Sequence, residues 1–235
     1  MKSHKKAVVF TGAGMSADSG VSTFRDADGL WESHRIEDVC TPEAWQRDPQ
    51  GVLDFYNARR AQLDEVVPNA GHRAVAELEK HFDHVVVVTQ NVDDLHERAG
   101  SSNVIHLHGE LRKARSERNP NVIVPAPGPT RLGDKGPDGA QLRPHIVFFG
   151  EAVPEYERAL QVVRDADLFL VIGTSLAVYP AAGLLYQIRP DVPVWLVDPR
   201  PARVTVPNPL TVIAKGAAEG VPPLVEELIQ RETAR

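Results

Sequence analysis

Small residues that could bind a nucleotide follow the first apolar run of the chain. Gly12, Ala13 and Gly14 come one residue after the apolar run 7–10, and small residues there let a backbone approach a pyrophosphate closely. The turn therefore indicates a phosphate site, with a dinucleotide as the expected ligand. Many strand ends carry a glycine turn for packing alone, so that alternative stays open at this motif.

A second polar group follows the apolar run at 85–89. Its residues Gln90, Asn91 and Asp93 offer amides and a carboxylate that could hold a carboxamide, ribose hydroxyls or an ordered water. Asn91 or Asp93 could equally cap a following helix. The group predicts either a ligand site or a helix start, and the two interpretations are even for this motif.

Histidines end the apolar run at 104–107. His108 stands directly before Gly109, where an imidazole can stand free in a cleft and act as a base near neutral pH. Its alternate neighbour His106 lies on the same face by strand parity. A lone histidine is more often structural, so the position at a strand end is what favours His108 as a base.

The order of the elements places these groups. Most of the apolar, β-rich runs are too continuously apolar for a sheet with one wet face, which predicts an α/β fold with a doubly wound, Rossmann-like parallel sheet. The expected strands are 7–11, 85–89, 104–107, 146–149, 168–172, 194–197 and 211–213. The expected helices are 52–66, 70–81, 92–99, 156–165, 181–188 and 224–231.

Ligands of such sheets bind beyond the carboxyl ends of the strands, so five polar groups should converge on one crevice. Besides the three groups above, Gly173, Thr174 and Ser175 follow the most apolar run and fit a second phosphate or ribose contact. A plain left-handed turn would also use this glycine. The fifth group is Asp198, at the end of the run 194–197.

Two stretches interrupt the alternation of strands and helices. Residues 26–50 are polar and carry prolines, which suits a mobile cover over a ligand or a passive connection. Residues 113–143 are dense in proline and glycine, so we expect them to be extended or loosely ordered and not helical.

Composition limits the class of protein. The 235 residues, 42% hydrophobic and 25% charged, can bury one main core, and the net charge of −6 argues against a nucleic-acid partner. The first apolar run breaks at Gly12 and no membrane-length run follows, so we expect a cytoplasmic protein with no membrane contact. The single cysteine, Cys40, has no neighbour suited to lowering a thiol pKa, which favours a small core residue over a nucleophile.

Six segments together resemble the sirtuins, the NAD-dependent protein lysine deacylases. They are GAGMSADSGVSTFR (12–25), TQNVDDLH (89–96), HLHGEL (106–111), PHIVFFGE (144–151), GTSLAVYPAA (173–182) and KGAAEGVP (215–222). The resemblance runs through nearly the whole chain. It implies a single domain, 1–235, with a Rossmann-like NAD-binding core at 1–25, 70–112 and 144–235, a cofactor loop and helical segment at 26–69, and a reduced small-domain insert at 113–143.

The resemblance also implies a role for each matching residue. His108 would be the general base, with Asn91 and Asp93 as the other catalytic residues, and the acyl group of a modified lysine would pass to ADP-ribose as nicotinamide leaves. A protein substrate would bind as an added strand beside 176–178, with Val178 in contact. The residues implied to bind NAD are Gly12, Ala13, Gly14, Phe24, Arg25, Gln90, Asn91, Asp93, Gly173, Thr174, Ser175, Asp198 and Ala218.

The acyl group can be predicted further. Tyr56 and Arg59 are three residues apart on an expected helix and share a face, and a phenol beside a guanidinium suits a carboxylate. In the succinyl- and malonyl-removing branch of the family a tyrosine and an arginine at this spacing bind that carboxylate, and the small Ala17 would widen the pocket. We therefore predict removal of succinyl or malonyl groups, with acetyl also accepted. A surface tyrosine and arginine without a shared ligand is the alternative.

Departures from the family qualify the resemblance. Most sirtuins bind zinc through two cysteine pairs in the small domain, whereas residues 113–143 contain no cysteine, so we predict a metal-free protein. Separately, we expect the protein to be a monomer. Asp94 stands where Asn or Gly is usual, and Asp198 where Asn is common. The glycine spacing is incomplete for a dehydrogenase, and a non-catalytic NAD sensor or an ADP-ribosyltransferase on the same fold remains the competing function.

Overall fold

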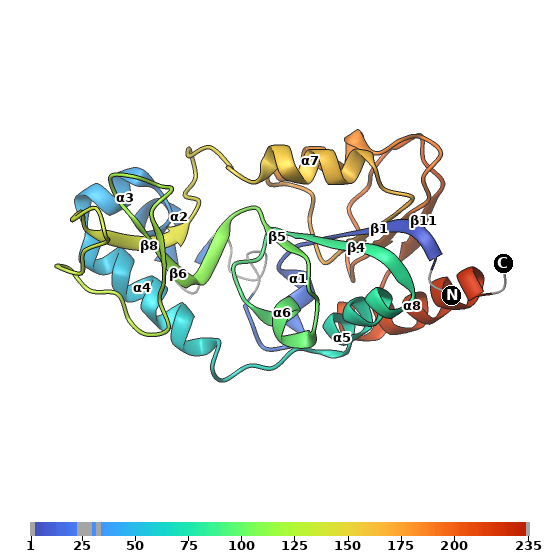
Figure 1. The fold of residues 1–235 in the computed structure, drawn as a ribbon, viewed down its shortest axis with the longest axis horizontal. Helices are drawn as coiled ribbons and strands as arrows, with labels where there is room; N and C mark the ends of the chain where they lie inside the picture. Colours follow the sequence, from blue (N-terminus) through green and yellow to red (C-terminus); the bar gives the residue numbers. More distant parts are fainter. Residues whose placement is uncertain (1–2, 23–29, 32–33, 234–235) are drawn as a thin grey trace.

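A six-stranded parallel sheet forms the larger lobe of the computed structural model, which describes residues 3–22, 30–31 and 34–233 (Figure 1). The strands lie in the order β11-β10-β9-β1-β4-β5. Their bounds are β1 Ser3–Thr11, β4 Phe82–Thr89, β5 Val104–His106, β9 Leu168–Ile172, β10 Val194–Val197 and β11 Leu210–Ile213. The chain passes from β1 to β4 on one side and later to β9 on the other. This confirms the doubly wound sheet and puts its switch point between β1 and β9.

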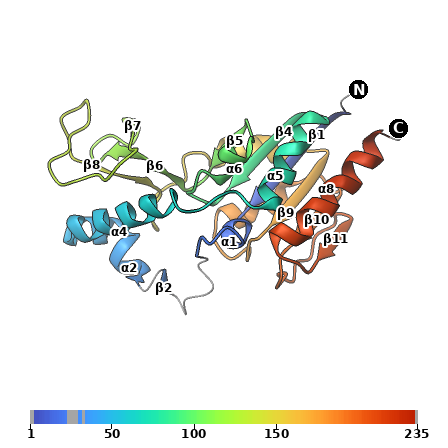
Figure 2. The ribbon, with the colours of Figure 1, turned by 90° about the horizontal axis from the view of Figure 1, so that it is seen from below.

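Helices cover both faces of this sheet because successive residues of its strands point to opposite sides. Val9 of β1 packs in one buried cluster with α5 (Ala70–Glu77) and α8 (Ala217–Thr233), which lie side by side in Figures 1 and 2. Val8 packs in the other cluster with α7 (Tyr156–Arg164) and the 3-10 helix η2 (Ala181–Gln187). Shorter helices, α1 (Gly14–Ala17), η1 (Leu78–Lys80) and α6 (Leu95–Ala99), lie at the strand ends and connections.

A smaller lobe lies at the end of the molecule opposite the two chain termini (Figures 1 and 2). It combines the antiparallel sheet β7-β6-β8 with three helices around a third buried cluster, and a two-stranded ribbon precedes it in the chain. The bounds are β2 Leu30–Trp31, β3 His34–Arg35, α2 Ile36–Val39, α3 Pro42–Arg47, α4 Pro49–Gln62, β6 Gly109–Ser116, β7 Ile123–Pro125 and β8 Leu142–Ile146.

Helix α4 fastens the insert at 113–143 to the rest of the chain. The Asn57 side chain donates to the Thr130 carbonyl and accepts from the Thr130 amide, both at 2.9 Å. The buried Arg60 donates to the carbonyls of Leu111, at 2.6 Å, and Gly128, at 2.9 Å. The insert is therefore extended and free of helices, the first of the two states predicted, and its strands and these contacts hold it in place.

Other expectations need correction. Residues 146–149 are not a strand of the parallel sheet: Ile146 ends β8 of the small antiparallel sheet, and the chain then turns away. The helix predicted at 181–188 is the 3-10 helix η2, and the one predicted at 92–99 begins only at Leu95. Among the described residues, no helix has the length and apolar character needed to cross a membrane.

Candidate functional site

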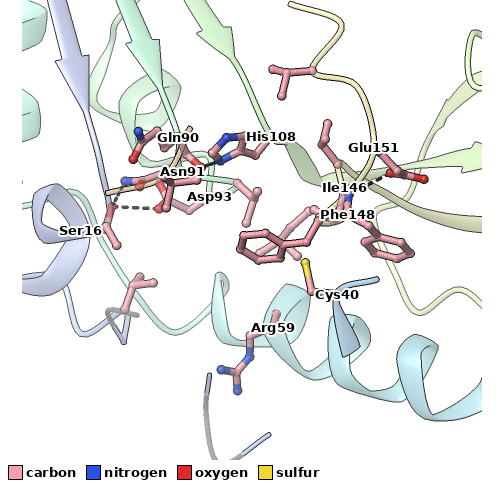
Figure 3. A pocket seen from close by; sticks show the side chains of 18 of the residues that line it. Ser16, Cys40, Arg59, Gln90, Asn91, Asp93, His108, Ile146, Phe148 and Glu151 are labelled. Carbon is pink, nitrogen blue, oxygen red and sulfur yellow. Dashed lines mark hydrogen bonds between the residues drawn. The ribbon is translucent and has the colours of Figure 1, made fainter. Parts of the chain in front are cut away.

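The site lies between the two lobes, in a cavity of about 240 Å³ (Figure 3). Polar side chains from the strand ends of the large lobe face it on one side, among them Gln90, Asn91 and His108. Apolar side chains of the small lobe, with Phe148 among them, face it on the other, and Arg59 of α4 also lines it, although its guanidinium points away from Phe148. The structure thus brings three of the five predicted strand-end groups, those that follow β1, β4 and β5, to the cavity at the carboxyl ends of the parallel strands.

Glycines allow the ends of β1 and β9 to meet. A Cβ atom on Gly12 would lie 2.7 Å from the Cβ of Thr174, and one on Gly14 would lie 2.7 Å from the Cα of Gly173. The Gly14 amide donates to the Gly173 carbonyl at 2.8 Å, so the two turns also pack on each other. These glycines therefore serve the packing of the two turns, and Ala13 between them lines the cavity.

The Gln90 side chain has a buried hydrogen-bond donor that a ligand could satisfy. Its Oε1 accepts from the Thr174 hydroxyl at 3.3 Å, whereas its Nε2 is buried and donates to no protein atom. A buried donor without an acceptor costs free energy, and a carboxamide or ribose oxygen in the cavity would remove that cost. The turn of glycines and this orphaned amide together fit a dinucleotide such as NAD.

His108 is held as a neutral base. Its Nδ1 lies 3.1 Å from the Gln90 carbonyl oxygen, and because a carbonyl only accepts, Nδ1 carries the hydrogen and Nε2 the lone pair. Burial lowers the pKa of His108, with the Gln90 carbonyl opposing that effect, so the lone pair is available at neutral pH. Gly109 makes the turn after it: its φ is +87°, and a Cβ there would lie 2.0 Å from the His145 carbonyl oxygen.

Asn91 and Asp93 meet on the hydroxyl of Ser16. The Ser16 Oγ donates to Asp93 Oδ2 at 2.8 Å and accepts from Asn91 Nδ2 at 3.1 Å. Asp93 Oδ1 also accepts from the Leu95 amide at the start of α6, so Asp93 supports the start of the helix and also lines the cavity. Burial raises the pKa of Asp93, against the effect of these hydrogen bonds.

Sequence reasoning missed Ser16 and the two histidines behind it. His72 Nε2 lies 3.5 Å from the Ser16 Oγ, and its ring packs edge-on against that of His96 with 4.9 Å between ring centres. Burial lowers the pKa of His72 to about 4 and that of His96 well below its ordinary value, so both rings are neutral. The available signal was the hydroxyl of Ser16 inside the first glycine turn.

The residues predicted for the adenosine side lie at the ends of β9 and β10 and at the start of α8, outside the cavity lining. Thr174 and Asp198 are buried, and Asp198 Oδ1 accepts from the Arg200 amide at 2.8 Å. Ser175 is half-buried. The Ala218 amide donates to Asp18 Oδ2 at 2.9 Å, which occupies that donor. Phe24 and Arg25 lie outside the described residues.

The predicted acyl-binding residues are only partly brought together. Arg59 and Val178 line the cavity, whereas Ala17 is exposed on α1 and does not, which corrects the expectation that it widens the pocket. Tyr56 is fully buried behind the wall and also does not line it. Its hydroxyl hydrogen-bonds with the thiol of Cys40, and its ring stacks 6.0 Å from that of Phe148.

Cys40 is both a core residue, as expected, and part of the cavity wall. Burial raises the pKa of its thiol, so it has no thiolate character at neutral pH. Beside it, Glu151 accepts from Arg115 and from Arg143, each at 2.7 Å, and from the Phe148 amide at 2.8 Å. At the edge of the cavity, the charge of the Glu151 carboxylate is thus balanced by two guanidinium groups.

Comparisons with known proteins agree with this geometry. A profile of the Sir2 family matches residues 12–180. An NAD-dependent protein deacylase of Bacteroides thetaiotaomicron is 56% identical over 231 residues, covering 96% of this chain and 98% of the relative. One of Helicobacter pylori is 50% identical over 226 residues, covering 96% and 98%.

Solved structures give the same picture. A Sir2 homologue in complex with NAD is 37% identical with a TM-score of 0.83, and the match covers 98% of this chain and 90% of that one. A complex of Sir2 with a p53 peptide and NAD+ is 26% identical with a TM-score of 0.75, covering 98% and 94%.

Proposed function

Because this chain belongs to the Sir2 family and is an NAD-dependent protein deacylase, we propose that it removes succinyl and malonyl groups from lysine side chains and accepts acetyl-lysine as well. The products would be free lysine, nicotinamide and O-acyl-ADP-ribose. One observation carries the acyl preference: of the described residues that line the cavity, Arg59 alone has a cationic side chain.

The position of Arg59 in the small-lobe wall favours an acyl chain that ends in a carboxylate. Arg59 extends from α4, with its Cζ atom 5.4 Å from the centre of the Phe55 ring and its guanidinium directed away from Phe148 (Figure 3). In the proposal the guanidinium turns toward the cavity when a carboxylate enters. Glu151 does not compete for it, since that carboxylate already pairs with two other arginines.

The buried Tyr56 belongs to the same proposal. Its hydroxyl lies behind the wall beside Cys40, and burial raises its pKa well above the ordinary value, so the phenol keeps its proton. A neutral phenol can donate to a carboxylate oxygen while Arg59 supplies the charge. A small shift of the Cys40 side chain would expose this donor to the cavity.

The strand-end residues would bind the cofactor and hold protons for the reaction. NAD supplies an electrophilic ribose carbon that bears nicotinamide as the leaving group. Gln90 Nε2 would bind a carboxamide or ribose oxygen, and Asn91 and Asp93, fixed through Ser16, would orient the ribose. His108 Nε2 would accept the proton of a ribose hydroxyl, the role for which its Nδ1–H tautomer prepares it.

A nicotinamide-release assay on matched acetyl-lysine and succinyl-lysine peptides tests the proposal. Arg59→Met should lower kcat/KM for succinyl-lysine by about 100-fold, as expected when a charged hydrogen bond is lost, and spare acetyl-lysine. The exposed Arg164→Met on α7 is the matched control and should change neither activity. Equal loss on both peptides would refute the acyl preference.

A His108→Ala variant tests the base. It should bind NAD but convert no acyl-lysine peptide to free lysine and O-acyl-ADP-ribose over many turnovers, because no other imidazole on the described cavity lining can take the proton of the ribose hydroxyl. NAD binding by the unaltered protein without turnover on either peptide would instead favour a sensor or an ADP-ribosyltransferase.

A further inference from the structure

Two histidines two residues apart hold consecutive carbonyls of the loop that carries the site. His108 Nδ1 lies 3.1 Å from the Gln90 carbonyl oxygen, and His106 Nδ1 lies 2.9 Å from that of Asn91. Carbonyl oxygens only accept, so both Nδ1 atoms carry a hydrogen. The two rings therefore position the backbone of Gln90 and Asn91 in the same way.

The two rings differ at Nε2. His106 Nε2 lies 2.7 Å from Glu97 Oε1 on α6, and the His106 side chain is only 7% exposed. A ring with a carbonyl at one nitrogen and a carboxylate at the other can satisfy both only as an imidazolium, with two N–H donors. His106 is thus a cation under the site, where His108 is a neutral base.

Charged groups around His106 agree with this state. Burial disfavours the charged ring, but the hydrogen bond and charge of Glu97, the Asn91 carbonyl and the charge of Glu110 on β6 outweigh it and raise the pKa of His106. Lys113 pairs with Glu110 at 2.5 Å, Asp93 adds a further carboxyl group from the loop, and His96 on α6 is neutral.

We propose that His106 is a positioning residue for deacylation that works only as an imidazolium, holding the Asn91 carbonyl through Nδ1–H while Glu97 holds Nε2–H. The proposal rests on the deacylase activity and on His108 as its base. When the ring loses a proton, the carboxylate is the stronger acceptor and keeps Nε2–H. The Nδ1 lone pair then faces the Asn91 oxygen, the two repel, and the loop carrying the Asn91 amide shifts.

The proposal gives the reaction two limbs in its dependence on pH. His108, whose pKa is lowered, must be unprotonated, so activity rises on the acid side below the ordinary histidine value of about 6.5. His106, whose pKa is raised, must be protonated, so its contribution is present below that pKa and is lost as the pH rises through it. The profile is a bell with its alkaline limb set by His106 and Glu97.

The test is the pH profile of kcat/KM on an acetyl-lysine peptide, from about pH 5 to about pH 10 to span both limbs. Glu97→Gln keeps an acceptor and removes the charge, so the alkaline limb should move about one pH unit lower, an about tenfold loss at a fixed alkaline pH, with the acid limb unchanged. His106→Asn keeps a neutral donor toward the Asn91 carbonyl and should remain active with no alkaline limb from this ring. Glu157→Gln, an exposed glutamate of α7, is the control.

Each outcome decides the proposal. If the unaltered protein shows no turnover, the deacylase assignment itself fails; if it turns over and Glu97→Gln and His106→Asn keep the alkaline limb of the control, the role of His106 is overturned. The ligand-type atoms of Glu97, His106 and Glu110 lie within 4.8 Å of one another. An alkaline limb that moves on adding a chelator or zinc would show a metal there and would also overturn the imidazolium.

Discussion

His106 and His108 differ in the group that faces Nε2, and this difference sets the protonation state of each ring. Both rings donate through Nδ1 to backbone carbonyls, and His106 then meets the Glu97 carboxylate, whereas the Nε2 of His108 keeps its lone pair. Strand parity predicts that the two rings share a face. It does not predict Glu97, because that residue comes from α6 and its approach depends on how the helix packs.

Substitution of Gly173 tests the close contact between the turns that follow β1 and β9. Gly173 has a φ of +62°, and a Cβ there would lie 2.2 Å from the Met15 amide nitrogen, which is backbone and cannot turn away. Gly173→Ala should lower the free energy of unfolding by about 2 kcal/mol or more, from the strained φ and the clash. It should also weaken NAD binding, because the first glycine turn must move.

Thermal unfolding and calorimetry with NAD measure these two effects. Gly183→Ala on η2 is the control, since its Cβ would lie 3.7 Å from the nearest atom, an ordinary contact, and it should change little. A Gly173→Ala protein with unaltered Tm and NAD affinity would contradict the close approach.

At the scale of elements, the parallel sheet was predictable and the small lobe was not. The buried strands are marked by continuous apolar runs such as 168–172, every residue of which is buried. The run at 146–149 looks similar, but only Ile146 belongs to a strand, β8 of the small sheet, and Phe148 packs in the small-lobe cluster after the strand has ended. Periodicity reports burial and does not say which neighbour buries a segment.

The acyl-binding residues show the same limit. Spacing correctly places Tyr56 and Arg59 on one helix, α4, but the burial of Tyr56 involves Cys40 and Phe148, which come from other elements. The Ser16 hydroxyl and its partners, which include Asn91 and His72, likewise come from three parts of the chain that only the folded sheet brings together.

Helix α4 should decide how firmly the insert is held. Arg60 is 2% exposed and donates to two carbonyls of the 109–130 region and to Asn57 Oδ1. Arg60→Met keeps the apolar stem but leaves those buried carbonyls without a donor, so we expect a loss of about 2 to 4 kcal/mol in the free energy of unfolding.

Hydrogen exchange locates that loss. Amides near Gly128 and Thr130 should exchange faster in Arg60→Met, and those of β9 in the large lobe should not. Arg73→Met, on the exposed surface of α5, is the control. Uniform faster exchange across both lobes would argue against a local role for Arg60.

At the scale of the whole molecule, the small lobe contains an ion-pair network. Most sirtuins bind zinc in the corresponding domain. Glu151 follows β8 and joins Arg115 of β6 to Arg143 of β8, and the Arg143 Cζ lies 3.8 Å from the centre of the Phe148 ring. The same contacts therefore brace the small sheet and the wall of the cavity. Stability of this lobe should depend on protons and not on a metal.

The sign of that dependence follows from Glu151. Burial raises the pKa of its carboxyl group, but the hydrogen bonds from Arg143 and Phe148 and the charges of Arg143 and Arg115 outweigh burial and lower it. A lowered pKa means that the stabilisation is complete above the ordinary value of about 4.5 and is lost as the pH falls through the pKa of the folded state. Acid should loosen the small lobe, with its cavity wall, below about pH 4.5.

The network can be tested by measuring the stability of the Glu151→Gln variant as a function of pH and that of the unaltered protein with a chelator. The variant should lower the free energy of unfolding at pH 7 by about 3 kcal/mol, since it leaves two buried guanidinium groups without a carboxylate, and should flatten the loss of stability in acid. A chelator should change neither Tm nor deacylation in the unaltered protein. A Tm that falls on chelation, with zinc recovered in stoichiometric amount, would show instead that a metal braces this lobe, because no pairing of Glu151 with arginine releases zinc.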